Sequence, residues 1–210
     1  MQPKDFGADE FRGALNLTPE RFERFAIYHG LLVKWQQKIN LISSNTLEDV
    51  WFRHFYDSAQ ILQYFPNDAR VIADLGSGAG FPGMVLKILN PELNMNLVES
   101  DERKCLFLRT VSRETGLHVS IHNERIERVS DSFVPDVVTA RALSALHRLI
   151  EFSSVWNRKN KKLQLILLKG ETADQEVGEA RKIFDFKVDS YPSATRSSAR
   201  VLRVSEVGCA

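Results

Sequence analysis

The residues best suited to chemistry surround a glycine-rich segment in the first half of the chain. The apolar run 71–75 contains Asp74 and leads directly into the loop GSGAG at residues 76–80. Glycines allow the backbone to approach a ligand closely, because no Cβ intervenes. In sheets of parallel strands, ligands bind at the carboxyl ends of the strands, where this loop would lie. The pattern therefore predicts a loop that binds a nucleotide-containing cofactor.

Asp74 distinguishes between two classes of cofactor. A dinucleotide loop cradles a pyrophosphate, and residues 78–83 do satisfy the pattern G-x-G-x-x-G, although the match begins past the end of the strand. A carboxylate beside a pyrophosphate is unfavourable, whereas S-adenosylmethionine presents an ammonium group with which it can pair. We therefore expect S-adenosylmethionine, and the alternative is that Asp74 only caps the turn.

Glu99 stands at the end of the next apolar run, residues 94–99. A carboxylate at that place can accept hydrogen bonds from both ribose hydroxyls of an adenosine. Either class of cofactor could use it, so Glu99 indicates adenosine binding without choosing between them. The alternative is a solvated acidic residue at a strand end.

Two helices are predicted before the glycine loop. Thr18 suits an N-cap and precedes Pro19 at the first helical position, and apolar residues then recur near helical spacing. A second helix is predicted to begin at Thr46, with Asp49 in the place of a capping-box acid, and to end before Pro66. We expect residues 1–66 to form a small helical extension.

Short apolar runs and helical patterns alternate after residue 70. We expect strands at residues 71–75, 94–99, 119–122, 137–139, 163–168, 186–191 and 200–204. Helices are expected at residues 84–89, 103–115, 143–155 and 173–183. This alternation predicts an α/β fold with a doubly wound, mostly parallel sheet in residues 67–210. No helix separates the last two strands, so one of them is expected to run antiparallel.

The composition is that of a soluble globular protein. Of 210 residues 43% are hydrophobic and 26% charged, and no apolar run approaches the roughly 20 residues that span a bilayer. The first residues contain no apolar signal segment. Cys105 and Cys209 lie far apart and form no CxxC pattern, which argues against a disulfide framework or a zinc site. We expect a cytoplasmic protein without a metal.

The charges are distributed unevenly along the chain. Residues 1–100 contain 9 Lys/Arg and 12 Asp/Glu, whereas residues 101–210 contain 19 and 15. The difference either reflects chance or indicates one basic face that binds the phosphates of a polyanion.

Several short motifs together resemble one bacterial protein family. They are Lys34-Trp35, Asn40-Leu41, Arg53-His54, Asp57-Ser58, the segment DLGSGAGFPG at residues 74–83, Glu99-Ser100, Phe107-Leu108-Arg109, Arg125-Ile126-Glu127, Ala140-Arg141-Ala142 and Leu168-Lys169-Gly170. The sequence resembles the RsmG family of 16S ribosomal RNA guanine-N7 methyltransferases, formerly called glucose-inhibited division protein B. The likeness extends from about Leu32 to Val204. Ile42 departs from the commonest family pattern, and residues 193–200 are hard to align.

The resemblance implies a class I, Rossmann-like methyltransferase sheet with a small N-terminal helical extension. It implies transfer of a methyl group from S-adenosylmethionine to N7 of a guanine in the so-called 530 loop of 16S rRNA. The substrate is expected to be rRNA within a 30S particle or assembly intermediate, and the enzyme to be a monomer. The residues expected to bind the cofactor are Asp74, Gly76, Ser77, Gly78, Gly80, Phe81, Glu99, Ser100, Arg125, Ile126, Glu127 and Arg141.

Other methylation chemistries lack their usual residues. Methylation of an exocyclic amine usually needs an Asp/Asn-Pro-Pro-aromatic loop after the fourth strand, where this chain has TARA at residues 139–142. Methylation of cytosine C5 needs a nucleophilic cysteine in a suitable loop, which neither cysteine provides. Guanine N7 has an in-plane lone pair and no proton to remove, so catalysis can rest on alignment of the reactants.

Basic residues follow the later strands. We expect four of them to gather near the cofactor and to position the RNA substrate: Arg125, Arg141, Lys169 and Arg200. They can bind phosphates, and arginine can also bind the O6 edge of guanine. Arg196 competes with Arg200 as the C-terminal RNA contact. Each single residue could instead be a surface charge.

His54 and Asp57 are three residues apart on a predicted helix and so share a face. They could brace the extension against the cofactor loop or form an ordinary structural pair. Two other functions remain as alternatives at this point. One is a nicotinamide-dependent oxidoreductase that uses the same loop, and the other is a non-catalytic RNA-binding protein with the same fold.

Overall fold

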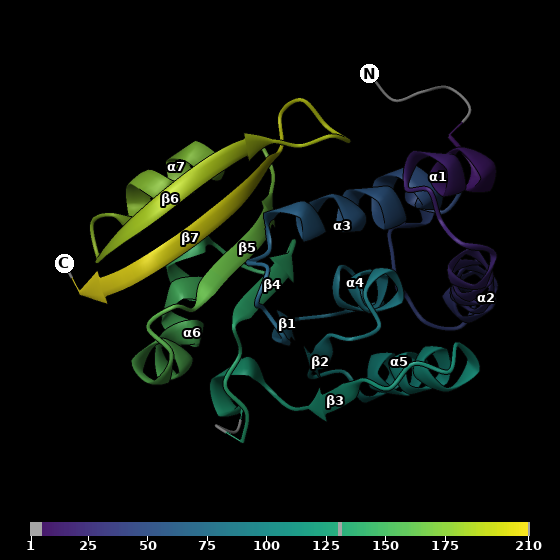
Figure 1. The fold of residues 1–210 in the computed structure, drawn as a ribbon, viewed down its shortest axis with the longest axis horizontal. Coiled ribbons are helices and arrows are strands. Elements are labelled where there is room, and N and C mark those ends of the chain that lie inside the picture. Colours follow the sequence, from purple (N-terminus) through teal and green to yellow (C-terminus); the bar gives the residue numbers. More distant parts are fainter. Residues whose placement is uncertain (1–5, 130–131, 210) are drawn as a thin grey trace.

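A seven-stranded sheet forms the centre of the molecule (Figure 1). The computed structural model describes residues 6–129 and 132–209. The strands lie in the order β3-β2-β1-β4-β5-β7-β6. Their bounds are β1 Val71–Leu75, β2 Asn94–Glu99, β3 Ser120–Asn123, β4 Val137–Arg141, β5 Gln164–Lys169, β6 Phe184–Pro192 and β7 Arg200–Cys209. The first five strands pair in parallel and β7 is antiparallel to both neighbours, as expected from the sequence.

Helices cover both faces of the sheet, as Figure 1 shows. They are α4 (Gly83–Leu89), α5 (Glu102–Glu114), α6 (Leu146–Lys159) and α7 (Ala173–Ala180). Side chains of β1 alternate between the faces, because successive residues of a strand point to opposite sides. Ile72 belongs to the core beneath α4 and α5, while Ala73 and Leu75 belong to the core beneath α6 and α7. The central strands are therefore buried on both faces, which explains their nearly continuous apolar sequence.

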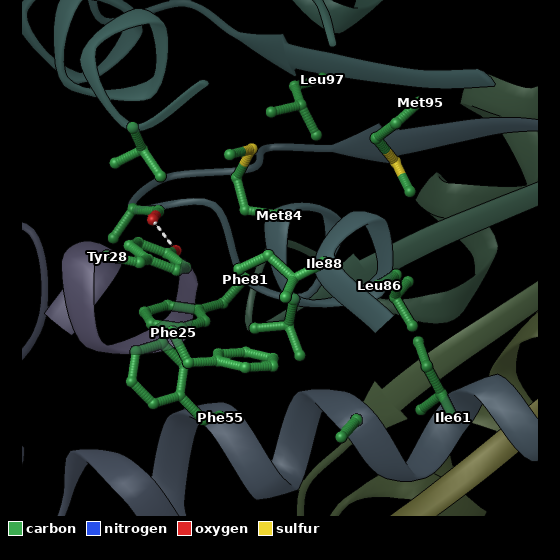
Figure 2. Close-up of a cluster of buried hydrophobic side chains, with 14 of the residues drawn as sticks. Phe25, Tyr28, Phe55, Ile61, Phe81, Met84, Leu86, Ile88, Met95 and Leu97 are labelled. Atoms are coloured by element: carbon green, nitrogen blue, oxygen red, sulfur yellow. Dashed lines mark hydrogen bonds between the residues drawn. The ribbon is translucent and has the colours of Figure 1, made fainter. Parts of the chain in front are cut away.

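The N-terminal extension packs against the α4–α5 face. It contains α1 (Ala8–Ala14), α2 (Pro19–Gln36) and a helical segment composed of η2 (Trp51–Tyr56), α3 (Asp57–Ala59) and η3 (Gln60–Tyr64). Figure 2 shows how Phe25, Tyr28 and Phe55 of the extension meet Phe81 and Met84 beside the sheet. One continuous core thus joins the extension to the sheet, so their relative position is set by aromatic packing.

The beginning of the second helix differs from the sequence prediction. Thr18 caps α2 as predicted, since its side chain accepts a hydrogen bond from the Arg21 amide. Thr46, however, ends a short 3-10 turn, η1 (Ser44–Thr46), and its hydroxyl donates to the Ser43 carbonyl at 2.7 Å. The hydroxyl is used within this turn, so the helical segment begins only near residue 50.

A second difference lies after β4. The helix expected from residue 143 begins at Leu146. Ala142, just before the expected start, has a left-handed backbone conformation with a φ of +50°, so the chain turns after β4 before the helix begins. Residues 142–145 therefore form a loop at the carboxyl end of β4. This loop contributes to both pockets described below.

Candidate functional site

The loop between β1 and α4 is supported by Asp74 from beneath. The side chain of Asp74 is 0% exposed, and its Oδ1 accepts a hydrogen bond from Thr139 Oγ1 at 2.9 Å. Its Oδ2 accepts one from the Gly83 amide at 3.2 Å. Burial raises the pKa of this carboxyl to about 6, although its hydrogen bonds act in the opposite direction.

The direct contact expected between Asp74 and a cofactor ammonium group remains a prediction, and the surroundings of this side chain also suit a structural role. The carboxylate faces the interior, and each of its oxygens already accepts a hydrogen bond from the protein. Its position corresponds to the alternative of a turn-capping role, because it joins the start of α4 to strands β1 and β4. Asp74 therefore shapes the loop and does not line the cavity in front of it.

Two glycines of the loop occupy backbone conformations that other residues rarely adopt. Gly76 has a φ of +62°, and a Cβ at this position would lie 2.5 Å from Leu143 Cδ1. Gly80 has a φ of +95°, and a Cβ there would lie 2.7 Å from the Tyr28 hydroxyl. That hydroxyl donates to the Ala79 carbonyl, a bond drawn as the dashed line in Figure 2. Helix α2 thus clamps the loop through Tyr28.

A cavity of about 490 Å³, here called the loop pocket, opens in front of the glycine loop. Glu99 lies at its edge, where Oε2 accepts from the Gly78 amide at 2.9 Å and Oε1 accepts from the Asp101 amide at 2.8 Å. Each carboxylate oxygen keeps a second lone pair that is available to a hydroxyl. Glu99 is therefore placed to accept hydrogen bonds from a ribose.

Most residues predicted to bind the cofactor line the loop pocket. They are Gly76, Ser77, Gly78, Phe81, Glu99, Ser100, Arg125, Ile126, Glu127 and Arg141. Asp74 and Gly80 lie outside its lining. Sequence reasoning missed Leu143 and Phe152, which add apolar surface suited to an adenine ring. No motif marks either residue, because only the packing of α6 and the loop after β4 brings them to the site.

A second cavity of about 470 Å³ adjoins the first and is here called the basic pocket. The two pockets share the wall formed by residues 141–144. The basic pocket is also lined by basic residues from four different segments: Arg53, Arg141, Lys169 and Arg196. Such a cavity suits an anionic or nucleotide ligand.

Arg141 stands between the two pockets. Its Nη2 donates to His54 Nδ1 at 2.9 Å, and its Nη1 donates to the Arg53 carbonyl at 3.3 Å. The guanidinium carbon lies 4.8 Å from the centre of the Phe81 ring, and Asp57 Oδ2 is 3.8 Å from Nη1. Residues of the extension therefore fix the orientation of this guanidinium.

His54 accepts the Arg141 hydrogen bond as a neutral imidazole. Burial, followed by the nearby Arg141 and Arg53, lowers the pKa of His54 to about 3. Since Nδ1 is the acceptor, the ring proton lies on Nε2, which donates to Thr46 Oγ1 at 2.9 Å. Thr46 in turn donates to Ser43, as described above. The chain of donors has one consistent direction from Arg141 to the backbone.

The other predicted basic residues occupy different places. Arg125 lines the loop pocket. Lys169 lines the basic pocket, but its ammonium group also binds the Ser144 carbonyl and Glu176 Oε2. Arg200 lines neither pocket, because its Nη1 donates to backbone carbonyls at residues 197 and 199. Arg196 is exposed and does line the basic pocket.

Residues 6–129 and 132–209 lack two kinds of feature. In these ranges no group of three or more His, Cys, Asp and Glu side chains is arranged to bind a metal ion. None of the helices in the same ranges is both long and apolar enough to cross a membrane.

The fold resembles solved structures of methyltransferases. The glycopeptide N-methyltransferase MtfA, complexed with S-adenosylmethionine, has a TM-score of 0.56 at 10% identity over 72% of this chain and 93% of that chain. A mutant of MtNAS in complex with S-adenosylmethionine also has a TM-score of 0.56, at 15% identity over 98% of this chain and 86% of that chain. At these identities the likeness supports the fold alone, which is the Rossmann-like class I methyltransferase fold.

Sequence similarity is much stronger. Residues 21–201 match the family GidB, described as rRNA small subunit methyltransferase G. Ribosomal RNA small subunit methyltransferase G of Rhodospirillum centenum is 43% identical over 203 residues, which cover 96% of this chain and 92% of the relative. The protein of the same name from Rhodospirillum rubrum is 40% identical over 99% of this chain and 98% of its own length. The chain therefore belongs to the rRNA small subunit methyltransferase G family.

Proposed function

We propose that this protein transfers the methyl group of S-adenosylmethionine to N7 of a guanine in the 530 loop of 16S rRNA. The single observation that carries the proposal is the shared wall between the two pockets. A cofactor in the loop pocket and a nucleotide in the basic pocket would meet at residues 141–144. Membership of the rRNA methyltransferase G family supports the same substrate class.

The residues of the loop pocket fit S-adenosylmethionine. Glu99 would accept hydrogen bonds from the ribose hydroxyls, the glycine loop would lie against the methionine portion, and Phe152 and Leu143 would contact the adenine. When bound, the cofactor supplies an electrophilic methyl group on a sulfonium centre. Ser77 and Gly78 offer polar backbone groups beside it without a bulky side chain. We assign Asp74 and Gly80 to the support of this loop.

No general base is required by the proposed reaction. Guanine N7 presents a lone pair in the plane of the ring, so the protein needs only to align it with the methyl group. Correct alignment of two reactants can lower a barrier by about 7–11 kcal/mol. Arg141 is the residue best placed for alignment, because it lines both pockets and is fixed by the extension. Its remaining N–H groups can bind guanine O6 or a phosphate.

The proposed substrate is rRNA within a 30S particle or an assembly intermediate. The net charge of the chain is only +1, so we expect its overall electrostatic attraction for free RNA of arbitrary sequence to be modest. We further propose that the protein acts as a cytoplasmic monomer. Residues 1–66 and 67–210 would then function as one unit, since residues of the extension complete the basic pocket.

Mapping of N7-methylguanosine in small-subunit rRNA tests this function directly. The modification in the 530 loop should be present in cells that carry the gene and absent from cells that lack it. The purified Arg141→Ala variant should methylate at no more than a tenth of the wild-type rate in single-turnover assays. This tenfold loss corresponds to about 1.4 kcal/mol of lost transition-state stabilisation. Unchanged methylation in cells without the gene would contradict the proposal.

A further inference from the structure

We infer that Asp57 selects guanine by accepting a hydrogen bond from the donor edge of the base, which carries N1–H and the 2-amino group. The inference rests on the proposed function and specifies how the basic pocket recognises its nucleotide. Asp57 lines that pocket and lies on the helical segment of the extension. From the sequence, Asp57 was expected either to brace the extension together with His54 or to form a structural pair with it.

The two oxygens of Asp57 have different surroundings. Oδ1 accepts hydrogen bonds from the Thr195 hydroxyl and from Gln60 Nε2, the latter at 2.9 Å. Within the described ranges Oδ2 accepts no hydrogen bond, and its nearest cation is Arg141 Nη1 at 3.8 Å. The carboxylate is thus held firmly through one oxygen while the other can accept from a ligand.

The other carboxylate in the basic pocket is already engaged. Glu176 Oε2 accepts from Lys169 Nζ at 2.7 Å and from the Leu146 amide at 2.9 Å. Its Oε1 accepts from Thr172 Oγ1 at 3.0 Å. Among the acidic residues that line this pocket, Asp57 is therefore the one with an oxygen that accepts no hydrogen bond from the described residues.

The positions of the two pockets determine which edge of guanine faces Asp57. N7 must face the loop pocket at the boundary formed by residues 141–144, because the methyl donor would lie on that side and must contact N7 directly. N1–H and the 2-amino group lie on the opposite edge of the purine and so face residues that line the basic pocket alone. Asp57 is one of these residues, whereas Arg141 belongs to both pockets. A carboxylate suits this edge, because both groups there are donors.

The same contact would become stronger as the reaction proceeds. Methylation at N7 places a positive charge on the purine, which makes N1–H and the 2-amino group better donors. A carboxylate that is already oriented towards them binds the charged product-like state more tightly than the neutral base. Asp57 would therefore affect the rate of methyl transfer as well as the choice of base.

Base analogues at the acceptor position test the inference. 16S rRNA is assembled by ligation with guanosine, inosine or 1-deazaguanosine at that position and reconstituted into small subunits. Inosine lacks the 2-amino group, and 1-deazaguanosine replaces N1–H by C–H, while both keep N7. Wild-type enzyme should methylate at least one analogue particle at least tenfold more slowly than the guanosine particle in single-turnover assays.

The decisive comparison uses Asp57→Asn. Thr195 and Gln60 both donate to Oδ1, so the amide oxygen should stay there and the NH₂ group should replace Oδ2. This variant should methylate guanosine particles slowly and show no further loss with the analogue. Thr195→Val is the control, because it disturbs the surroundings of Asp57 by removing one hydrogen bond to Oδ1 and yet keeps the carboxylate. Its analogue penalty should match that of wild type.

The possible results separate this inference from the function on which it rests. Loss of the analogue penalty in Asp57→Asn, and in Asp57→Ala as a second variant, supports it. The inference is overturned if wild type shows no penalty with either analogue, a result that does not depend on whether the variants fold. It is also overturned if Asp57→Asn keeps the full penalty. If wild type fails to methylate the guanosine particle, the proposed function itself is wrong.

Discussion

Asp74 illustrates how a buried residue can shape a site that it does not line. Its carboxylate joins the amide of Gly83 to the hydroxyl of Thr139 and so ties the start of α4 to β4. Because burial raises the pKa from 3.8 to about 6, the charged form is less favourable in the folded protein than in the unfolded chain, although it still predominates at pH 7. The two hydrogen bonds that this carboxylate accepts are what it contributes to the shape of the loop.

Asp74→Asn tests this role. Asparagine can accept from the Gly83 amide while its NH₂ group reaches Thr139, so affinity for S-adenosylmethionine measured by calorimetry should change less than about threefold. A raised folded-state pKa gives a stability contribution that is present below pH 3.8 and is lost as the pH rises through about 6. The variant should therefore be at least as stable as wild type at pH 8. A tenfold loss of affinity, about 1.4 kcal/mol, would instead indicate direct pairing with the cofactor ammonium group.

The neutral state of His54 predicts that this residue, unlike Asp74, stabilises the folded protein at neutral pH and loses that contribution in acid. Burial and the two neighbouring arginines lower its pKa from 6.5 to about 3. The unfolded chain then binds a proton that the folded protein does not, so stability is present above pH 6.5 and is lost as the pH falls towards about 3. At pH 5 the loss should be about 2 kcal/mol, from a difference of roughly 1.5 pH units.

Denaturant unfolding of wild type and His54→Gln at pH 7 and pH 5 measures this effect. Glutamine can accept from Arg141 and donate to Thr46, but it does not titrate. The free energy of unfolding of wild type should fall by about 2 kcal/mol more than that of the variant. Equal losses would show that His54 is protonated in the folded protein. Asp57 and Asp74 are present in both proteins, so the changes in the free energy of unfolding that come from titration of these carboxyl groups cancel in the comparison.

At the scale of elements, the loop between β1 and α4 is clamped by helix α2. The Tyr28 hydroxyl donates to the Ala79 carbonyl, and the space around Gly80 is filled by the same hydroxyl and by Met84 and Leu108. A helix of the extension thereby sets the conformation of a loop that belongs to the sheet. Figure 2 shows Tyr28 stacked beside Phe81, which follows that loop.

Gly80→Ala should disturb this clamp. The new methyl group would lie 2.7 Å from the Tyr28 hydroxyl and 2.8 Å from Met84 Cγ, at a φ of +95°. We expect a loss of at least 2 kcal/mol in the free energy of unfolding, roughly the combined cost of overpacking and backbone strain, together with weaker cofactor binding.

Gly30→Ala is the matched control for that substitution. Gly30 lies exposed within α2, and no atom lies within 4 Å of a Cβ built there. Alanine should stabilise the helix by up to about 1 kcal/mol. Similar unfolding midpoints for the two variants would contradict the clamp.

At the scale of the whole molecule, the extension and the sheet build the basic pocket together. Arg53 and Asp57 come from the extension, Arg141 and Lys169 from strand ends, and Arg196 from the connection between β6 and β7. Gln60 binds that connection, since its Oε1 accepts from the Ala194 amide at 2.8 Å. The pocket therefore depends on contacts between parts far apart in the sequence.

The modest charge of the molecule predicts a preference for structured substrate. Reconstituted 30S particles should be methylated at least tenfold faster than a short RNA that contains the same loop sequence, measured as kcat/KM at equal ionic strength. We expect recognition to come largely from the shape of the particle, because a net charge of +1 provides little overall attraction for RNA. Equal rates on a short unstructured RNA would sink this expectation.

The sequence by itself determined the sheet and predicted most of the residues that line the loop pocket. Strands and glycine loop follow from local apolar runs, turn residues and alternation with helices, which are properties of neighbouring residues. Because parallel strands end at one edge, Glu99, Arg125 and Arg141 were expected together, and the structure places all three on the loop pocket. The class I methyltransferase fold is confirmed on the same basis.

Only the tertiary structure decided which of these groups line the pockets. Asp74 is buried and Arg200 donates to the backbone carbonyls of residues 197 and 199, while Arg196, Leu143 and Phe152 line the pockets. The direction of a side chain depends on which partners satisfy its hydrogen bonds, and those partners are distant in the chain. The neutral His54 and the half-engaged Asp57 have the same origin, because burial and charge at a site arise only when separate elements pack together.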